Sequence, residues 1–325
     1  MENSDVAIID TGFDLKLRPK ELTEFVGNEL IIARLKVMIQ AAKERGEALG
    51  HVLFHGPPGL GKTTLAAIVA REMGANFLTS SGPAIEKAGD LAGILTNLQE
   101  NDVLFIDEIH RLQKNIEEYL YSAMEDFTLD LMIDSGPSAR SISVTLNKFT
   151  LIGATTKTGN LSAPLRSRFP LALRLEYYDT DSLSKIITRS AKLMGVSINP
   201  PSALEVAKRS RGTPRVANNI LRWVRDYAQL NNKNVIDEKT VRQACTMIAI
   251  DEMGLDEMDK KILRVIIDHH EGGPVGIKSI AASIGEEETT LIEVYEPYLI
   301  MKGLLRRTSR GREVTKIAYD HLGES

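Results

Sequence analysis

The sequence predicts an α/β protein with a parallel sheet core, followed by a helical domain and a C-terminal winged-helix domain. Apolar runs that lead into a glycine-rich loop at residue 56 and into paired acids at residue 107 indicate buried parallel strands. Residues 180–252 have helical periodicity, punctuated by Gly, Pro and Asn. From residue 253, helix-like stretches precede two strand-like pieces around Arg310 and Gly311, which is the pattern of a winged helix. We therefore expect domains over residues 1–179, 180–252 and 253–325.

Composition narrows the function classes. The chain has 325 residues, 43% of them hydrophobic, with a formal net charge of -4, so a nucleic-acid-binding surface would have to be local. No apolar run approaches the ~18 residues that span a bilayer, and the acidic start lacks the features of a signal peptide. We expect a cytoplasmic protein. The single cysteine, Cys245, cannot form an internal disulfide and is given no role.

A phosphate-binding loop follows the first apolar run. The stretch GPPGLGKTT matches G-x-x-x-x-G-K-[ST] between a predicted strand and a predicted helix. Its backbone N–H groups would surround phosphate oxygens, Lys62 would reach the β and γ phosphates, and Thr63 would hold Mg²⁺. A glycine-rich turn that binds nothing is the alternative. The predicted nucleotide-binding residues of the loop are Gly56, Gly59, Gly61, Lys62, Thr63 and Thr64.

Two acids and a threonine are predicted to face the same phosphates. Asp107 and Glu108 end the apolar run 103–106, and ligands of open α/β sheets bind at the carboxyl ends of strands. Asp107 suits the magnesium shell, and Glu108 suits polarising the attacking water. Thr156, with Thr155 as the second choice, ends the strand-like run FTLIGATT and could sense the γ phosphate. On their own, the two acids could equally belong to a solvated loop.

The segment APLRSRFP carries two arginines, Arg166 and Arg168, and no acid. A P-loop ATPase gains transition-state stabilisation when an arginine reaches the γ phosphate, in cis or from a neighbouring molecule. We expect Arg168 to point out of the subunit and complete the site of a neighbouring copy, which implies a closed ring. The alternative is a solvated surface arginine.

Six segments carry a family resemblance that spans nearly the whole chain, in order. They are LRPKELTEFVG, GPPGLGKTT, LFIDEIHRL, GATT, APLRSRF and RGTPRVANNILRWVRD. Together they resemble the AAA+ ATPases and, within them, the RuvB family of bacterial motors that drive branch migration of Holliday junctions. Lys157 and Pro170 depart from the family pattern, which has arginine and glycine there.

The resemblance implies roles for further residues. It makes Arg168 the finger that acts in trans, with Arg166 assisting or packing beside it. It makes Arg215 of the GTPR segment a second sensor on the helical lid, and it implies ATP and Mg²⁺ as cofactors. The residues implied near the adenine side of the nucleotide are Leu17, Arg18, Glu125, Asp126, Phe127 and Tyr178.

The resemblance also implies partners and a setting. It implies a homo-oligomeric ring, a hexamer, acting on the duplex arms of four-way junctions with RuvA, which recognises the junction, and the RuvC resolvase. The setting is recombination and DNA repair, including the SOS response to DNA damage. It places the loop after the second predicted strand near DNA, with Lys87 as its basic residue. Two other functions are weighed against the ring motor. One is a clamp-loader-like assembly factor; the other is a transcription regulator, which would bind DNA sequence-specifically.

An insertion before the GATT segment predicts a β-hairpin over residues 128–146. Apolar and polar residues alternate on both sides of a Ser-Gly-Pro-Ser turn. An exposed hairpin with an apolar face suggests a docking surface, and the resemblance makes RuvA its partner. A hairpin packed on its own domain is equally compatible with the pattern. The apolar positions are Leu129, Leu131, Ile133, Ile142 and Val144.

Positive charge gathers in the predicted wing, where residues 302–316 hold six basic residues against one acid, Glu313. Such a wing can bind phosphates without reading bases. Three acids at the start of the predicted recognition helix, residues 286–288, argue against major-groove readout. We predict DNA contacts by Arg307, Arg310 and Arg312. A solvated basic hairpin is the alternative.

Overall fold

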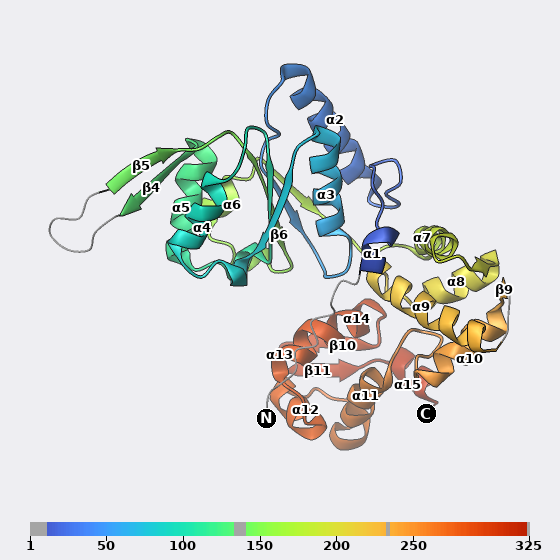
Figure 1. Ribbon diagram of the computed structural model, residues 1–325. Coiled ribbons are helices and arrows are strands. Elements are labelled where there is room, and N and C mark those ends of the chain that lie inside the picture. The colour runs from blue at the N-terminus through green and yellow to red at the C-terminus, as the bar shows by residue number, and fades with distance from the viewer. Residues whose placement is uncertain (1–11, 133–140, 232–234, 324–325) are drawn as a thin grey trace. The chain divides into compact units, whose positions relative to one another are not determined.

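The structure is a computed structural model that describes residues 12–132, 141–231 and 235–323 (Figure 1). The chain forms two compact units. The first contains Met1–Ser182 and Thr213–Arg215, and the second contains Leu183–Gly212 and Val216–Ser325. Within the described residues, no helix combines the length and the apolar character that crossing a membrane requires.

A five-stranded parallel sheet forms the centre of the first unit, in the order β2-β3-β6-β1-β7. The strands β1 and β6 consist almost entirely of buried residues, which a parallel sheet covered on both faces requires. His55 pairs with Thr155, and Ser81 pairs with Asp107, so the carboxyl ends of neighbouring strands meet at one edge. The strands are β1 Val52–His55, β2 Phe77–Ser81, β3 Val103–Asp107, β6 Thr150–Thr155 and β7 Leu171–Arg174.

Helices cover the sheet in two layers (Figure 1). On one face lie α2 (Glu29–Arg45) and α3 (Lys62–Met73); on the other lie α4 (Ala88–Thr96), α5 (Lys114–Glu125) and α6 (Ala163–Ser167). The second face packs through a cluster that includes Leu91, Leu120 and Leu165 with Leu104 and Leu151 of the strands. The short elements are α1 (Gly12–Leu17), η1 (Gly82–Ala84), η2 (Ile109–Arg111) and η3 (Thr158–Asn160).

The expected hairpin is an antiparallel pair, β4 (Thr128–Met132) and β5 (Ser141–Thr145), in which Leu129 pairs with Val144 and Leu131 with Ile142. Leu129 is only 1% exposed and belongs to the core of the unit, so its assignment to a docking surface is wrong. Val144 is half-buried, and Ile142 is 50% exposed. Ile133 lies outside the described residues.

The second unit begins with a set of helices: α7 (Thr180–Leu193), α8 (Pro200–Arg209), α9 (Pro214–Leu230) and α10 (Glu238–Met247). Asn199 and Asp237 cap α8 and α10 through their side chains, as residues of these types do at helix starts. A short parallel pair, β8 (Ser197–Ile198) and β9 (Val235–Ile236), joins the loops. Trp223 is 36% exposed, and its Nε1–H donates to the Ala244 carbonyl of α10 at 2.8 Å. Burial raises the pKa of the Cys245 thiol to about 11.

A winged helix completes the second unit. The predicted recognition helix is interrupted by a π turn, η4, with one short helix before it and one after it. Val275 bridges Arg312, which adds a third strand-like segment beside the wing. The fold-class prediction is confirmed. The elements are α11 (Glu257–His270), α12 (Ile277–Ile284), α13 (Glu288–Thr290), η4 (Leu291–Tyr295), α14 (Glu296–Met301), β10 (Leu305–Thr308), β11 (Gly311–Val314) and α15 (Lys316–Leu322).

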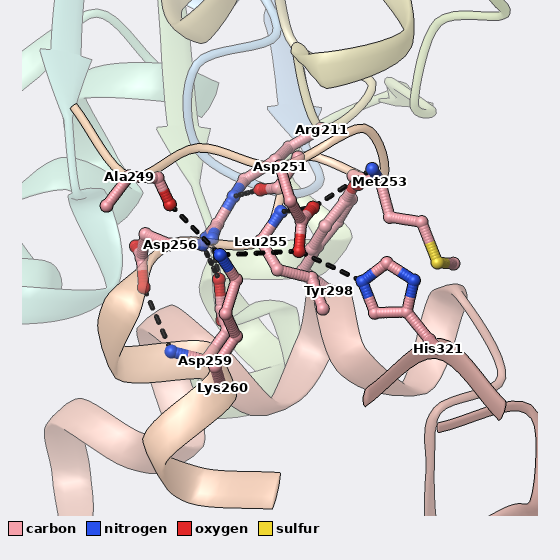
Figure 2. A network of polar contacts seen from close by, with 11 residues as sticks. Arg211, Ala249, Asp251, Met253, Leu255, Asp256, Asp259, Lys260, Tyr298 and His321 are labelled. Atoms are coloured by element: carbon pink, nitrogen blue, oxygen red, sulfur yellow. Dashed lines mark hydrogen bonds and ion pairs between the residues drawn. The ribbon is translucent and has the colours of Figure 1, made fainter. Parts of the chain in front are cut away.

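Inside the second unit, Arg211 joins the helical part to the winged helix (Figure 2). Its Nε–H donates to the Gly254 carbonyl at 3.0 Å, and its Nη2 forms ion pairs with Asp256 at 3.3 Å and with the buried Asp259. The guanidinium lies over the Tyr298 ring, 4.8 Å from its centroid. One side chain thus holds the linker and two helices of the winged helix together.

Asp251, in the linker before the winged helix, organises the other side of this network (Figure 2). One carboxylate oxygen accepts hydrogen bonds from the backbone N–H groups of Met253 and Leu255, at 3.0 and 2.9 Å. The other lies 2.9 Å from His321 Nε2 and 3.5 Å from Lys260 Nζ. The linker is therefore fixed to α11 and α15 by charge as well as by packing.

Candidate functional site

The loop between β1 and α3 has the geometry of a phosphate-binding loop. Gly56 has φ 134°, and a Cβ there would lie 2.3 Å from the Leu175 carbonyl oxygen, so only glycine fits. Gly61, the residue before α3, has φ 97°. The loop ends at the N-terminus of a helix of 12 residues, where free N–H groups and the helix dipole favour an anion.

Lys62 lies inside this loop and is 7% exposed. Its Nζ donates to the carbonyl oxygens of Gly56 and Pro57, at 2.9 and 2.8 Å. Burial lowers the pKa of Lys62, while the nearby carboxylates of Asp107 and Glu108 raise it. A buried ammonium group that is held at the loop and faces two acids is a fixed positive charge for a phosphate chain.

The paired acids lie at the carboxyl end of β3. Thr63 and Asp107 line one cavity of about 590 Å³, together with Arg18 and Arg71, so the two predicted magnesium ligands share an open space. Asp107 Oδ1 accepts from the Glu108 backbone N–H at 2.9 Å. Glu108 has φ 47°, a conformation that non-glycine residues adopt at a cost and that is enriched at functional sites.

The carboxyl end of β6 brings its threonines to Glu108. The Thr156 hydroxyl donates to Glu108 Oε2 at 3.5 Å, a long hydrogen bond. Thr155 is fully buried, and its hydroxyl lies 2.9 Å from Nδ1 of His110. Sequence reasoning missed His110; its position in the turn directly after the paired acids was the available signal.

Further residues predicted around the nucleotide lie near the loop backbone. The Arg215 backbone N–H donates to the Gly59 carbonyl at 3.4 Å, while its side chain is exposed. Tyr178 is buried and donates from its hydroxyl to the Leu60 carbonyl at 3.1 Å; burial raises the pKa of this phenol. Leu17 is buried, and Arg18 is half-buried at the cavity wall. Tyr178 and Arg215 thus contact the loop backbone, and Arg18 lines the cavity that Thr63 and Asp107 share.

Arg168 has partners in α5, outside its own segment, and one partner within that segment. Its Nη2 forms an ion pair with Glu125 Oε2 at 2.8 Å, and its Nη1 donates to the Pro164 carbonyl at 2.9 Å. The guanidinium lies over the Tyr121 ring, 4.5 Å from its centroid. These contacts come from α5 and α6, on the face of the sheet opposite α3 (Figure 1). The neighbouring Arg166 is exposed.

Glu125, which pairs with Arg168, ends α5, and Asp126 and Phe127 follow it in the chain. The two acids are exposed, whereas the Phe127 ring packs edge-on against Phe149 with centroids 5.8 Å apart. Phe127 also has a positive φ, 51°. This segment therefore belongs to the Arg168 side of the unit.

The wing separates its basic residues into two groups. Arg306, Arg307 and Arg310 are exposed. Arg312 is 8% exposed, and its Nε and Nη2 donate to the two carboxylate oxygens of Glu296 at 3.1 and 2.9 Å. Glu296 thus holds the Arg312 guanidinium inside the domain. That Arg312 contacts DNA stays a prediction. Lys87, at the start of α4, is exposed.

The phosphate loop on a parallel sheet, followed by a helical lid and a winged helix, defines the class of this protein: it is a AAA+ P-loop ATPase. Three family models match along the chain. They describe the Holliday junction DNA helicase RuvB P-loop domain over residues 17–175, the RuvB AAA lid domain over 178–251 and the RuvB C-terminal winged helix domain over 252–323. The chain belongs to the RuvB family.

Relatives and solved structures agree with this assignment. The chain is 64% identical over 313 residues to the Holliday junction branch migration complex subunit RuvB of Protochlamydia amoebophila, covering 96% of this chain and 94% of the relative. The corresponding protein of Kosmotoga olearia is 59% identical over 307 residues, covering 94% and 90%. The structure of the Thermotoga maritima RuvB Holliday junction branch migration motor superposes with a TM-score of 0.86 at 51% identity, covering 95% of this chain and 99% of that one. A RuvB winged helix at the C-terminus disfavours the clamp-loader interpretation.

Proposed function

We propose that this protein is an ATP-driven ring motor that translocates duplex DNA and drives branch migration of Holliday junctions. One observation carries the proposal: a single chain joins a phosphate loop with a buried lysine to a winged helix whose wing exposes basic residues. The names of the relatives quoted above point to the same activity. We propose that the protein acts in the cytoplasm, in recombination and DNA repair. Its functional domains would span residues 1–179, 180–252 and 253–325.

ATP fits the loop. Backbone N–H groups of the loop would surround the phosphate oxygens, and Lys62 would exchange its two carbonyl contacts for the β and γ phosphates. Thr63 and Asp107 would hold Mg²⁺, which supplies charge neutralisation at the phosphates. The shared cavity of these two oxygen donors supports this assignment. Leu17, Arg18 and Tyr178 would enclose the adenine side.

Hydrolysis needs a positioned water and stabilisation of the developing charge. Glu108 would polarise the water, and Thr156 would orient it from the neighbouring strand. Arg168 would supply charge to the site of the neighbouring copy, because its helix α6 and the helix α3 that follows the loop lie on opposite faces of the sheet (Figure 1). Arg215 would report the nucleotide state to the lid. Glu125, the partner of Arg168, and the adjacent Asp126 are exposed, and both would meet the nucleotide of the neighbouring copy.

The ring and its partners follow from the shared site. A finger that acts in trans closes a ring, and we propose a hexamer. The hairpin β4–β5, whose strand β5 exposes Ile142, would bind the junction-recognition protein RuvA, and the assembly would pass its product to the RuvC resolvase. Arg307 and Arg310 would hold the duplex by its phosphates, which suits a motor that moves along any sequence.

A junction-migration assay tests the proposal. The protein, ATP and Mg²⁺ are incubated with a labelled synthetic four-way junction, with and without RuvA, and conversion to two duplexes is followed over time. We expect conversion that requires ATP, increases with RuvA and is lost in Arg168→Ala. Hydrolysis of ATP with no conversion under either condition would refute the motor function.

A further inference from the structure

The backbone that carries Glu108 is held tightly. Glu108 has φ 47°, and the 3-10 turn η2 follows it at once. Gly82 of η1 packs closely against this turn: a Cβ at Gly82 would lie 2.4 Å from the Glu108 carbonyl oxygen and 3.2 Å from the Leu112 nitrogen. The position of the Glu108 Cα is thus fixed by packing, and the direction of its flexible side chain depends on what its carboxylate contacts.

The side chain of His110, from the same turn, contacts that carboxylate. Its Nε2 lies 3.3 Å from Glu108 Oε2, and its Nδ1 lies 2.9 Å from the Thr155 hydroxyl oxygen. The His110 side chain is 5% exposed, so packing allows the ring little freedom. The ring therefore bridges the carboxyl ends of two adjacent strands, β3 and β6.

The polar contacts of the bridge are compatible with one direction of donation. A carboxylate oxygen only accepts, so a proton on Nε2, the ring nitrogen 3.3 Å from Glu108 Oε2, gives that contact a donor. Nδ1 then accepts from the Thr155 hydroxyl. The Thr155 oxygen in turn accepts from the backbone N–H of Lys157 at 2.9 Å. With this tautomer, each donor in the chain of contacts faces an acceptor.

We propose that His110 is a positioning residue for ATP hydrolysis: it orients the Glu108 carboxylate by linking it to Thr155. The proposal rests on the proposed function of Glu108 as the group that polarises water. Thr156, the residue after Thr155, contacts the same Glu108 oxygen, so a shift at the end of β6 reaches the carboxylate by two routes. His110 thereby couples the strand that senses the γ phosphate to the group that acts on the water.

Steady-state ATP hydrolysis by the full chain in the presence of duplex DNA tests this proposal. The variants are His110→Ala, which removes the bridge, His110→Gln, which keeps an N–H donor, and Thr155→Val, which removes only the hydroxyl. A double variant, His110→Ala with Thr155→Val, tests whether the two residues act as one unit. ADP affinity and the unfolding midpoint are measured for each variant, to separate hydrolysis from binding and from folding.

We expect His110→Ala to lower kcat by about tenfold to hundredfold, the scale of a misplaced catalytic group, with KM for ATP and ADP affinity within about twofold. His110→Gln should recover part of the loss, Thr155→Val should lower kcat less, and the double variant should be no worse than His110→Ala. A kcat within about threefold of wild type, a rise in KM instead, or multiplied losses in the double variant would overturn the proposal. Absence of hydrolysis by the wild type would instead reject the function on which it rests.

Discussion

Arg312 and Glu296 form a bidentate ion pair in the interior of the winged helix, with distances of 3.1 and 2.9 Å. The pair joins the wing strand β11 to the helix α14. Both residues are almost fully buried, at 8% and 5% exposure. The wing is therefore anchored by one of its own arginines, while the exposed ones remain available for phosphates.

Arg312→Ala should destabilise the winged helix. Removing one partner of a buried pair leaves an uncompensated charge and costs about 3–5 kcal/mol. The double variant Arg312→Met with Glu296→Met removes both charges and should recover most of that loss. Urea unfolding followed by circular dichroism measures both effects. An unfolding midpoint for Arg312→Ala equal to that of Arg310→Ala, an exposed control, would contradict the structural role.

Arg307→Ala and Arg310→Ala should weaken binding of duplex DNA equally for unrelated sequences. Each would remove about one phosphate contact and lower the slope of log affinity against log salt by about 1. Fluorescence anisotropy across a salt series measures the slope. Arg45→Ala is the control, because it removes an exposed arginine from α2 in the first unit, where no DNA contact is predicted. Losses confined to one DNA sequence would argue for base readout instead.

Gly254→Ala should loosen the joint between the helical part and the winged helix. Gly254 has φ 78°, and a Cβ would lie 2.7 Å from the Arg209 carbonyl oxygen and 3.1 Å from the Tyr298 hydroxyl. Gly46 has a similar φ, 66°, with no atom within 4 Å of a Cβ, so Gly46→Ala carries the left-handed strain alone, about 1–2 kcal/mol. We expect a larger loss of stability at Gly254, with faster hydrogen exchange in α11. Equal losses at both glycines would remove the steric argument.

Acid should destabilise the first unit through His51. The ring accepts from the Leu151 N–H at 2.9 Å and donates to the Met124 carbonyl at 3.1 Å, and burial lowers its pKa below the ordinary value of 6.5. The unfolded chain then binds a proton before the folded chain does. Stability therefore falls as the pH drops through 6.5 toward the folded pKa, by at most about 1.4 kcal/mol per pH unit for one group.

Comparing unfolding midpoints at pH 7.5 and pH 5.5 for the wild type and His51→Gln tests this prediction. Glutamine keeps a donor and an acceptor but does not titrate, so the variant should lose less stability on acidification. His55, whose pKa is lowered by burial and by nearby Arg174 and Lys62, contributes to the same trend in both proteins. An identical pH dependence in the two would show that the His51 ring is not responsible.

Much of the site was predictable because its residues follow strands. The phosphate loop and the acids at 107 and 108 come directly after buried apolar runs, and a parallel sheet brings strand ends to one edge. The register of β3 with β6 then places Thr156 beside Glu108 without any long-range information beyond strand order. The winged helix was predictable for a similar reason, since its elements are consecutive in the chain.

What the sequence could not predict depends on contacts between distant segments. Arg168 pairs with Glu125, 43 residues away, so its segment seemed to lack any partner. Arg312, on strand β11, is neutralised by Glu296 of the helix α14, which a count of local charges cannot reveal. Alternation in the hairpin identified Leu129 as apolar, but which face packs on the core depends on how the hairpin leaves the sheet.

The central claim is that each hydrolysis site is completed by Arg168 of a neighbouring copy. A mixing experiment tests it: Lys62→Ala, which cannot hold the phosphates, is combined with Arg168→Ala, which lacks the finger, and ATP hydrolysis of the mixture is compared with each variant alone. In mixed rings, an intact loop on one subunit meets an intact finger on the next, so we expect activity that neither variant has by itself. Activity of the mixture no greater than the sum of the separate variants, in rings shown to exchange subunits, would contradict the shared site.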